Sequence, residues 1–306
     1  MKEIKNIILC GCGAIGSIYA DIFSKIPDIN FRVLVDEERL NRYSSNPILF
    51  NGNKLDLRYI LPCDMNFKAD LVIIATKMPG FEGALSEIKN FVSDDTVILS
   101  LLNGVLSEEI AAKYYGRDKV LYSYFIGHSS VRSGNKVSHD GVNTIVFGSD
   151  CEDDKLNVLR VKNLFDKYNI NYEIPEDIRH SLWTKFMLNV SSNSTTALFR
   201  VNFGQMLSNP LHIDLVIKIM KEVQLIAQAE GVNSPETLVD DALSCFGKMC
   251  PEGRTSMLQD VEAGRKTENE IFASTVVELG KKHNIDTPYC LIIDSMFKII
   301  DYNFTK

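Results

Sequence analysis

The sequence lacks any apolar run long enough to cross a membrane. Its longest runs, such as residues 71–75 and 97–102, fall far below the roughly 20 residues that a spanning helix requires. The opening residues, M-K-E-I-K-N, lead into only a short apolar stretch, which does not fit a signal peptide. We therefore expect a cytoplasmic protein with no membrane partner.

The sequence also has no excess of positive charge and no cysteine framework. Its 33 Lys and Arg residues stand against 40 Asp and Glu residues, which gives a formal net charge of −7. No global basic field is present to attract nucleic acid, so nucleic acid is not an expected partner. The 7 cysteines are odd in number and scattered, which favours reduced thiols buried as small apolar side chains.

What is present is the composition of an ordinary globular protein, long enough at 306 residues for about two domains. Apolar runs of strand length alternate with helix-like segments such as residues 14–25, and they occupy residues 6–10, 31–35, 71–76, 96–102, 119–125 and 144–148. Runs that are apolar on both faces are typical of a buried parallel sheet. Residues 1–175 are therefore predicted to form an α/β domain with a mostly parallel, Rossmann-type sheet.

Helical periodicity replaces the strand pattern after Pro175. The expected helices cover residues 178–198, 211–230, 235–250, 256–264, 267–284 and 288–302. Turn signals containing Gly and Pro separate them. Residues 176–306 are therefore predicted to form a second, all-α domain.

A glycine-rich loop, G-C-G-A-I-G, joins the first predicted strand to the first predicted helix. In this context the first glycine permits a tight turn, the second lets the backbone approach a pyrophosphate, and the third allows close helix packing. The helix N-terminus then offers N–H groups to the phosphates. The predicted dinucleotide-binding residues are Gly11, Cys12, Gly13, Ala14, Ile15 and Gly16. A glycine turn with only a packing role is the alternative.

Asp36 follows the second predicted strand, 20 residues beyond Gly16. An acidic residue at this point accepts hydrogen bonds from the adenosine ribose and repels a 2′-phosphate, so it favours NAD(H) over NADP(H). Arg32, Arg39 and Arg42 lie near enough in sequence to weaken that preference.

Cys10 and Cys12 do not predict a metal site. No nearby His or Cys completes a four-ligand set, and the spacing is not one typical of zinc. Cys10 is more simply a buried strand residue, and Cys12 a small residue beside a phosphate.

Lys77 and Asn103 each follow a predicted strand directly. Ligands of open parallel sheets bind beyond the carboxyl ends of the strands, so both residues are candidate ligand contacts. The alternatives are a solvated loop lysine and an ordinary Asn-Gly turn.

A polar stripe runs along the apolar segment W-T-K-F-M-L-N-V-S-S-N. Lys185, Asn189 and Asn193 recur every four residues, which places them on one helix face with about 40° of drift per step. A cation and two amides on an otherwise apolar helix need partners, and a ligand carboxylate and carbonyl would supply them. The alternative is a partly exposed helix whose polar face meets water.

Two later residues have simple structural interpretations. Ser256 is expected as an N-cap or loop hydroxyl, and Glu268 is expected at the start of a helix.

Six motifs together resemble the ketopantoate reductase (2-dehydropantoate 2-reductase) family. They are G-C-G-A-I-G, A-T-K, L-N-G, W-T-K-F-M-L-N-V-S-S-N, S-M-L-Q-D and R-K-T-E, and their order and spacing cover nearly the whole chain. Residues 132–139 also resemble the last sheet strands of the family. The resemblance implies an NAD(P)H-dependent reductase of pantothenate biosynthesis, with a cofactor domain followed by a helical substrate domain.

The resemblance also implies roles for individual residues. Lys185 would be the proton donor, and Glu268 would support its charge. The residues implied to bind a small 2-keto acid are Asn103, Asn189, Asn193 and Ser256. The residues implied to complete the cofactor side are Lys77, Asn103 and Glu268. A homodimer is kept as a possible assembly.

The chain departs from the family pattern at several positions. Asp36 stands where many members carry arginine, T-E-I-D reads T-E-N-E from Thr267, the following Asn-Gly reads Ala273-Ser274, and P-x-N reads P-Y-C. These departures bear on cofactor choice and substrate. An NAD-dependent D-2-hydroxyacid dehydrogenase acting on a branched or aromatic 2-keto acid is therefore the alternative enzyme. A non-catalytic dinucleotide sensor would not need the aligned lysine and asparagines.

Overall fold

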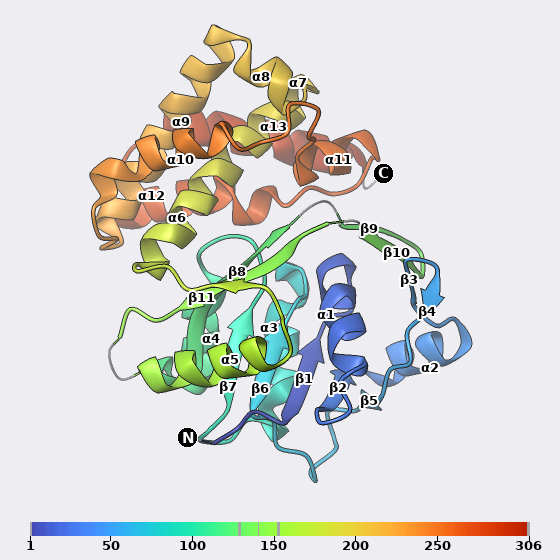
Figure 1. Cartoon of the computed structure of the whole chain (residues 1–306). Helices are drawn as coiled ribbons and strands as arrows, with labels where there is room; N and C mark the ends of the chain where they lie inside the picture. The colour runs from blue at the N-terminus through green and yellow to red at the C-terminus, as the bar shows by residue number, and fades with distance from the viewer. Residues whose placement is uncertain (1, 128–129, 140, 152–153, 305–306) are drawn as a thin grey trace. The chain divides into compact units, whose positions relative to one another are not determined.

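The computed structural model describes residues 2–127, 130–139, 141–151 and 154–304 (Figure 1). The chain divides into two compact units, residues 1–178 and 179–306. Each unit is described below by itself.

The first unit is built on an eight-stranded sheet. Its strands are β1 (Asn6–Cys10), β2 (Asn30–Leu34), β5 (Tyr59–Ile60), β6 (Leu71–Ile74), β7 (Val97–Ser100), β8 (Val120–Gly127), β11 (Asn143–Gly148) and β12 (Tyr172–Glu173). They lie in the order β5-β2-β1-β6-β7-β8-β11-β12, and the first six are parallel. This order, with the direction of winding changing between β1 and β6, is that of dinucleotide-binding folds. The predicted fold class is confirmed.

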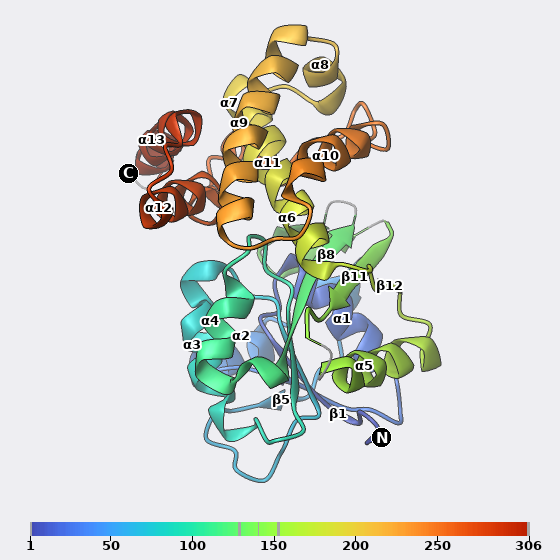
Figure 2. The same ribbon diagram turned by 90° about the vertical axis from the view of Figure 1, so that its left-hand side faces the viewer.

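Helices cover both faces of this sheet (Figure 2). On one face, α1 (Ala14–Ser24) and α5 (Lys155–Lys167) pack against the odd-numbered positions of β1. On the other, α3 (Phe81–Glu87) and α4 (Ser107–Tyr115) pack against the even-numbered positions. Both sets of strand side chains are buried, which is why the strands read as continuous apolar runs.

Residues 132–139 lie in a second, smaller sheet. Its strands are β3 (Leu49–Phe50), β4 (Asn53–Lys54), β9 (Ser130–Ser133) and β10 (Lys136–His139), in the order β4-β3-β10-β9. Residues 132–139 therefore lie in a strand hairpin, as the resemblance implied, and this hairpin belongs to the small sheet. The remaining elements of this unit are α2 (Glu37–Ser45), η1 (Met78–Gly80), η2 (Ile88–Asn90) and η3 (Arg117–Lys119).

The second unit contains helices throughout its described residues. They are α6 (Ile178–Leu188), η5 (Asn189–Asn193), α7 (Ser194–Phe199), α8 (Phe203–Leu207), α9 (Pro210–Ala229), η6 (Pro235–Thr237), α10 (Leu238–Phe246), α11 (Ser256–Glu262), η7 (Asn269–Ile271), α12 (Ala273–His283) and α13 (Pro288–Phe304). The long helix α9 lies at the centre, with α8, α10, α12 and α13 packed against it.

Two of the expected helices are interrupted. The helix expected over 178–198 contains a π-helical turn, η5, between α6 and α7. The helix expected over 267–284 begins only at Ala273, after the short 3₁₀ turn η7. Both interruptions fall at residues singled out as site candidates.

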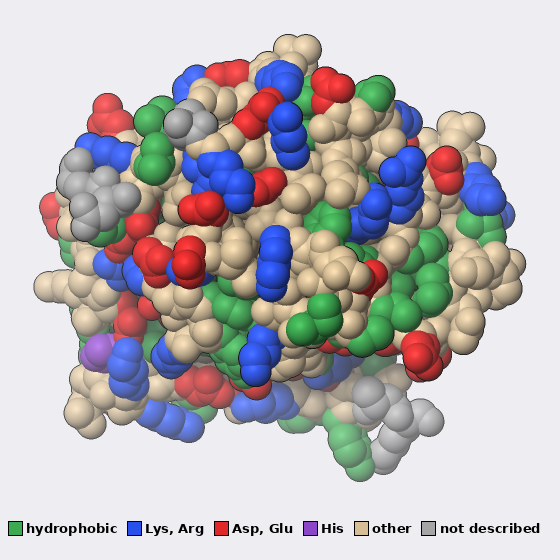
Figure 3. Space-filling view, turned by 90° about the horizontal axis from the view of Figure 1, so that it is seen from below, with side chains coloured by type: hydrophobic (Ala, Val, Ile, Leu, Met, Phe, Trp, Pro, Cys, Tyr) green, Lys and Arg blue, Asp and Glu red, His purple; other side chains and the backbone are tan. Residues whose placement is uncertain are grey.

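In the part of the chain that the structure describes, no helix combines the length and the apolar character needed to cross a membrane. On the face shown in Figure 3, basic and acidic side chains are interspersed.

Candidate active site

The cofactor candidates of the first unit lie at one edge of its sheet. Gly11 directly follows β1, and Asp36, Lys77 and Asn103 lie two or three residues beyond the ends of β2, β6 and β7. These four strands are adjacent and parallel, so their carboxyl ends share an edge. The structure thus brings these four residues to the ligand-binding edge of the fold.

The three glycines of the loop meet different surroundings. At Gly11 the φ angle is +89°, and an added Cβ would lie 2.7 Å from the Ala75 carbonyl oxygen. At Gly16 an added Cβ would lie 1.9 Å from the Gly11 oxygen. Gly13 has open space where its Cβ would stand. Packing therefore explains Gly11 and Gly16, whereas Gly13 leaves room for a ligand to approach the backbone.

The start of α1 fits a pyrophosphate. Gly13 is the N-cap and, because glycine has no side chain, it makes no side-chain hydrogen bond to the N-terminal amides. These amides and the helix dipole attract an anion. Nearby, the buried Thr76 hydroxyl has no hydrogen-bond partner among the described residues. A nicotinamide dinucleotide bound here would contact the loop 11–16 through its phosphates.

Asp36 is the N-cap of α2, a role that the sequence analysis missed. Its Oδ1 accepts a hydrogen bond of 2.6 Å from the Arg39 backbone N–H, and its Oδ2 lies 3.2 Å from the Arg39 guanidinium. The cap fixes the carboxylate at the end of β2, where an adenosine ribose would bind. Arg39 partly neutralises its charge.

The two loop cysteines are buried thiols. Burial raises the pKa of both Cys10 and Cys12. Across the described ranges, no cluster of three or more His, Cys, Asp or Glu side chains is placed to hold a metal ion.

The β9–β10 hairpin contacts the glycine-rich loop. Arg132 donates a hydrogen bond to the Cys12 carbonyl, and the Ser130 hydroxyl donates one to the Ala14 carbonyl across 3.1 Å. These two hairpin contacts give no signal in the sequence.

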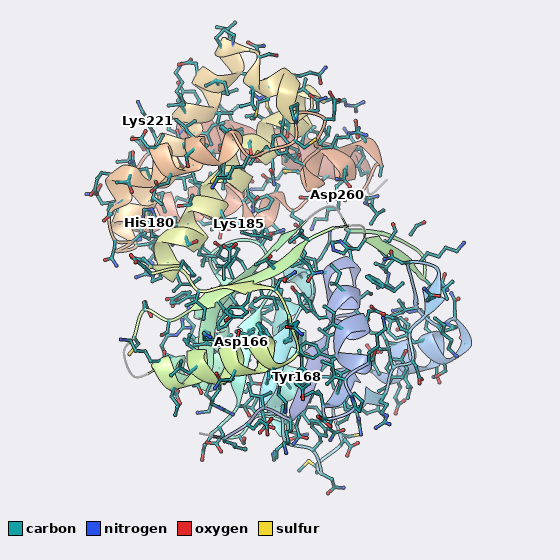
Figure 4. All side chains as sticks on the ribbon, in the orientation of Figure 1. Asp166, Tyr168, His180, Lys185, Lys221 and Asp260 are labelled. Carbon is teal, nitrogen blue, oxygen red and sulfur yellow. The ribbon has the colours of Figure 1, made fainter. Side chains whose placement is uncertain are left out.

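The polar stripe of the second unit runs from α6 into η5. Figure 4 labels Lys185 on α6. Lys185, Asn189 and Asn193 are all partly exposed, while the intervening Phe186 and Val190 are buried. The Asn193 Nδ2 donates to the Asn189 Oδ1 across 3.0 Å. These partly exposed polar groups, set between buried apolar side chains, offer hydrogen-bond partners to a polar ligand.

The π-turn changes the alignment of this stripe. In an α-helix a four-residue step overshoots one turn by about 40°. A π-turn takes more residues per turn, so the step from Asn189 to Asn193 does not repeat that overshoot. Lys185 and Asn193 are therefore better aligned than a continuous α-helix would place them.

Hydroxyl groups explain why this segment tolerates the wider turn. Four hydroxyl side chains each donate a hydrogen bond of 2.7 to 2.9 Å to the carbonyl four residues earlier in the chain. They are Ser191, Ser192, Thr195 and Thr196. Such bonds compete with the regular backbone pattern of a helix and distort it locally. The run S-S-N-S-T-T is thus a local cause of η5.

Ser256 lies beside this stripe, at the first position of α11. The N-cap is Thr255, whose hydroxyl accepts the Leu258 N–H, so the expectation of Ser256 as the cap is wrong. The Thr255 and Thr196 hydroxyls are 3.0 Å apart, and α11 packs on α7. The structure therefore brings exposed Ser256 close to the segment that carries Asn193.

Glu268 lies between α11 and α12, where it caps η7 rather than opening a long helix. It is partly exposed, while its neighbours Thr267 and Asn269 are buried. The neighbours are held by α13, as described below.

Comparison with known proteins agrees with this architecture. The family described as "Ketopantoate reductase PanE/ApbA" matches residues 7–150, and "Ketopantoate reductase PanE/ApbA C terminal" matches residues 177–301. A curated relative from Streptococcus pyogenes serotype M6, named 2-dehydropantoate 2-reductase, is 26% identical over 95% of this chain and 96% of its own length.

Two solved structures share the fold. A ternary structure of D-mandelate dehydrogenase with NADH and anilino(oxo)acetate superposes with a TM-score of 0.85 at 20% identity, covering 98% of this chain and 99% of that one. A ketopantoate reductase from Staphylococcus aureus, described as dimeric, has a TM-score of 0.78 at 22% identity, with coverage of 98% and 99%. Together with the two family matches, which span most of the chain, these findings show that this protein belongs to the ketopantoate reductase family and is a nicotinamide-dependent oxidoreductase.

Proposed function

We propose that this enzyme reduces 2-dehydropantoate (ketopantoate) to pantoate, a step of pantothenate biosynthesis. The observation that carries the proposal is the stripe of Lys185, Asn189 and Asn193, whose intervening apolar residues Phe186, Met187 and Val190 are buried. A 2-keto acid offers a carboxylate and a carbonyl, which match two amides and an ammonium. The name of the relative at 26% identity supports the same substrate.

The chemistry follows from these groups. A bound reduced nicotinamide would supply the hydride to the keto carbon. Lys185 would stabilise the negative charge developing on the keto oxygen and transfer its Nζ proton there, so that a C–H and an O–H bond form as the carbonyl π bond breaks. Solvent then returns a proton to the amine. A carboxylate near an amine favours its charged form, which is the role proposed for Glu268.

The remaining candidates complete the site. Asn189, Asn193 and Ser256 would bind the substrate carboxylate and hydroxyls. On the first unit, Asn103 would contact cofactor and substrate, and Lys77 would contact the cofactor. Loop 11–16 would bind the pyrophosphate, a role supported by the open space at Gly13 and the uncapped start of α1.

We further propose that NADH is preferred over NADPH. The support is the fixed Asp36 carboxylate, which would accept ribose hydroxyls and repel a 2′-phosphate. The Arg39 guanidinium, 3.2 Å from Asp36, limits this preference because it reduces the local negative charge.

The same Asp36 favours a second candidate, an NAD-dependent D-2-hydroxyacid dehydrogenase for another branched or aromatic 2-keto acid. The fold likeness to D-mandelate dehydrogenase fits this alternative. The two candidates share the cofactor, the proton donor and the reaction, and they differ only in the side chain of the keto acid.

We propose a homodimer as the assembly. The S. aureus neighbour is described as dimeric, and α13 exposes an apolar stripe of Ile292, Met296, Ile299 and Tyr302, each 47% exposed or more. These positions recur every three or four residues, so they form one face. Light scattering should give twice the chain mass, and Ile299→Glu should shift it toward the monomer. A monomeric parent enzyme would refute the assembly.

Steady-state assays decide between the functions. NADH and NADPH are each combined with ketopantoate, 2-ketoisocaproate and phenylglyoxylate, and kcat/KM is compared. The highest value with NADH and ketopantoate supports the main proposal, and a higher value with either other acid supports the alternative. Cofactor binding without turnover on any acid would favour the dinucleotide sensor.

A further inference from the structure

The two residues that flank Glu268 are both tied to α13. The Thr267 backbone N–H donates to the Asp301 Oδ1 across 2.8 Å, and the Thr267 hydroxyl donates to the Asp301 Oδ2 across 2.9 Å. On the other side, the Asn269 Nδ2 donates to the Asp294 Oδ1 across 2.8 Å. Glu268 therefore lies between two carboxylate anchors.

The anchors act from one helix face. Asp294 and Asp301 are seven residues apart, which is two turns of α13. Between the anchored neighbours, the Glu268 carbonyl accepts the Ile271 N–H across 3.0 Å, closing η7. Thr267 is thus held through its backbone and its hydroxyl, and Asn269 through its side chain, so the segment is held on both sides of Glu268.

Asp294 is the more buried anchor, at 3% exposure. Its carboxylate also accepts the Ser274 hydroxyl, and the Lys298 Nζ lies 2.6 Å away. Burial alone would raise its pKa, but Lys298, Ser274 and Asn269 outweigh this effect and lower the pKa. A buried carboxylate that stays charged is a strong acceptor, because charge-assisted hydrogen bonds are stronger than neutral ones.

Two of the donors to Asp294 meet at one oxygen. The Asn269 Nδ2 and the Ser274 hydroxyl both bind Asp294 Oδ1, and the Asn269 Nδ2 also lies 3.2 Å from the Ser274 hydroxyl oxygen. These three side chains form one hydrogen-bonded unit next to Glu268 in the chain.

We infer that Asp294 and Asp301 are positioning residues that hold Glu268 in place for the reaction. The inference rests on the proposed function, since it requires Glu268 to act in that site. Asp301 accepts hydrogen bonds from Thr267 and Asp294 accepts one from Asn269, the two residues next to Glu268, so we expect their effect on turnover to pass through Glu268.

A double-mutant cycle tests the inference on the full-length protein. Asp294→Asn removes the charge and one acceptor oxygen of the first anchor, and Thr267→Val removes the hydroxyl donor to the second. Both change the side-chain volume little, and each is also combined with Glu268→Gln. We measure kcat and KM, the NADH dissociation constant by fluorescence titration, the melting temperature, and amide hydrogen exchange over residues 267–272. Glu222→Gln is the matched control, because buried Glu222 binds the Tyr289 and Cys290 N–H groups at the other end of α13.

The expected results separate positioning from stability. Asp294→Asn should lower kcat about tenfold, because a neutral amide oxygen holds Asn269 and Ser274 less strongly than a carboxylate does, and it should speed amide exchange over 267–272 by a similar factor. In the Glu268→Gln background it should cause no further loss. Glu222→Gln should lower the melting temperature while leaving kcat unchanged.

Two outcomes would overturn the inference in distinguishable ways. If Glu268→Gln is impaired but Asp294→Asn and Thr267→Val retain the parent kcat, the positioning role is wrong and the proposed function stands. If Glu268→Gln is as active as the parent, the role proposed for Glu268 is wrong, and the inference is wrong with it.

Discussion

Asn193 donates a hydrogen bond to Asn189 across 3.0 Å, so the two amides of the stripe form one unit. The bond uses the Asn189 oxygen as an acceptor, which leaves the Asn189 N–H groups and one Asn193 N–H to face a ligand. Amide donors suit the carboxylate of a keto acid. Under the proposed function, the pair would present these donors to the carboxylate of the substrate.

This coupling predicts non-additive losses of substrate affinity. Asn189→Ala and Asn193→Ala should each raise KM for ketopantoate by about 10- to 150-fold, since a hydrogen bond to a charged group contributes roughly 1.5–3 kcal/mol. The double variant should lose less than the product of the two, because each single change already disorders the partner amide. Steady-state kinetics checks this, and fully multiplicative losses would show that the amides act independently.

Lys185→Met should reduce kcat by about 10²- to 10⁴-fold, the usual contribution of a positioned general acid. The NADH dissociation constant should stay the same, because Lys185 is assigned to the substrate carbonyl. Lys221, an exposed lysine of α9 labelled in Figure 4, supplies the control, and Lys221→Met should retain full activity. An active Lys185→Met enzyme would remove Lys185 from the mechanism.

The glycine loop predicts opposite effects at two of its positions. Gly13→Ala adds a methyl group to open space, so the melting temperature should hold while the NADH dissociation constant rises at least tenfold. Gly16→Ala places a Cβ 1.9 Å from the Gly11 oxygen, so the protein itself should be destabilised. Calorimetry and fluorescence titration separate the two. Unchanged NADH binding in Gly13→Ala would support the packing-only alternative for this loop.

Much of the first unit could be predicted because its strands are buried on both faces. Continuous apolar runs locate β1, β6 and β7 whatever lies around them, and chain order then places Lys77 and Asn103 at the ligand edge. By contrast, the two-residue strands β3, β4 and β5 carry too few residues for a period to show.

In the second unit, the spacing of residues predicts some features of the structure and not others. The spacing of Lys185 and Asn193 indicates a shared face, but the π-turn that improves their alignment depends on hydroxyl bonds such as Ser191 to Met187. The link from Asp294 to Asn269 joins residues 25 apart in sequence, and each side chain taken singly resembles a surface polar group. Contacts of this kind depend on tertiary packing and leave no periodic signal.

Asp36→Ser gives a sharper test of cofactor choice than an arginine would. A serine can still cap the N-terminus of α2, as Asp36 does, whereas an arginine would remove the cap and lower the stability by about 1 kcal/mol. With the negative charge gone and Arg39 released, the ratio of kcat/KM for NADPH over NADH should rise at least tenfold. Arg39→Ala should move the ratio the other way. An unchanged ratio in Asp36→Ser would show that the carboxylate does not set the preference.

Glu108 predicts a pH dependence of stability. It is 1% exposed at the start of α4, where its Oε2 accepts the Ser107 hydroxyl across 2.9 Å, and burial raises its pKa from 4.5 to about 7. Between these values the folded state binds more protons than the unfolded state, so the free energy of unfolding falls as pH rises from about 4.5 to 7.

The size of this effect can be measured by comparison with a variant that does not titrate. The raised pKa corresponds to a loss of at most roughly 3 kcal/mol across the window, which is complete above the folded-state pKa. Urea unfolding at pH 5, 6, 7 and 8 should therefore show a steeper decline for the parent than for Glu108→Gln. Groups whose pKa is lowered, such as Asp241, act at lower pH and cancel in the comparison. Parallel curves for the two proteins would show that Glu108 is ionised in the folded state throughout this range, with its burial offset by hydrogen bonds.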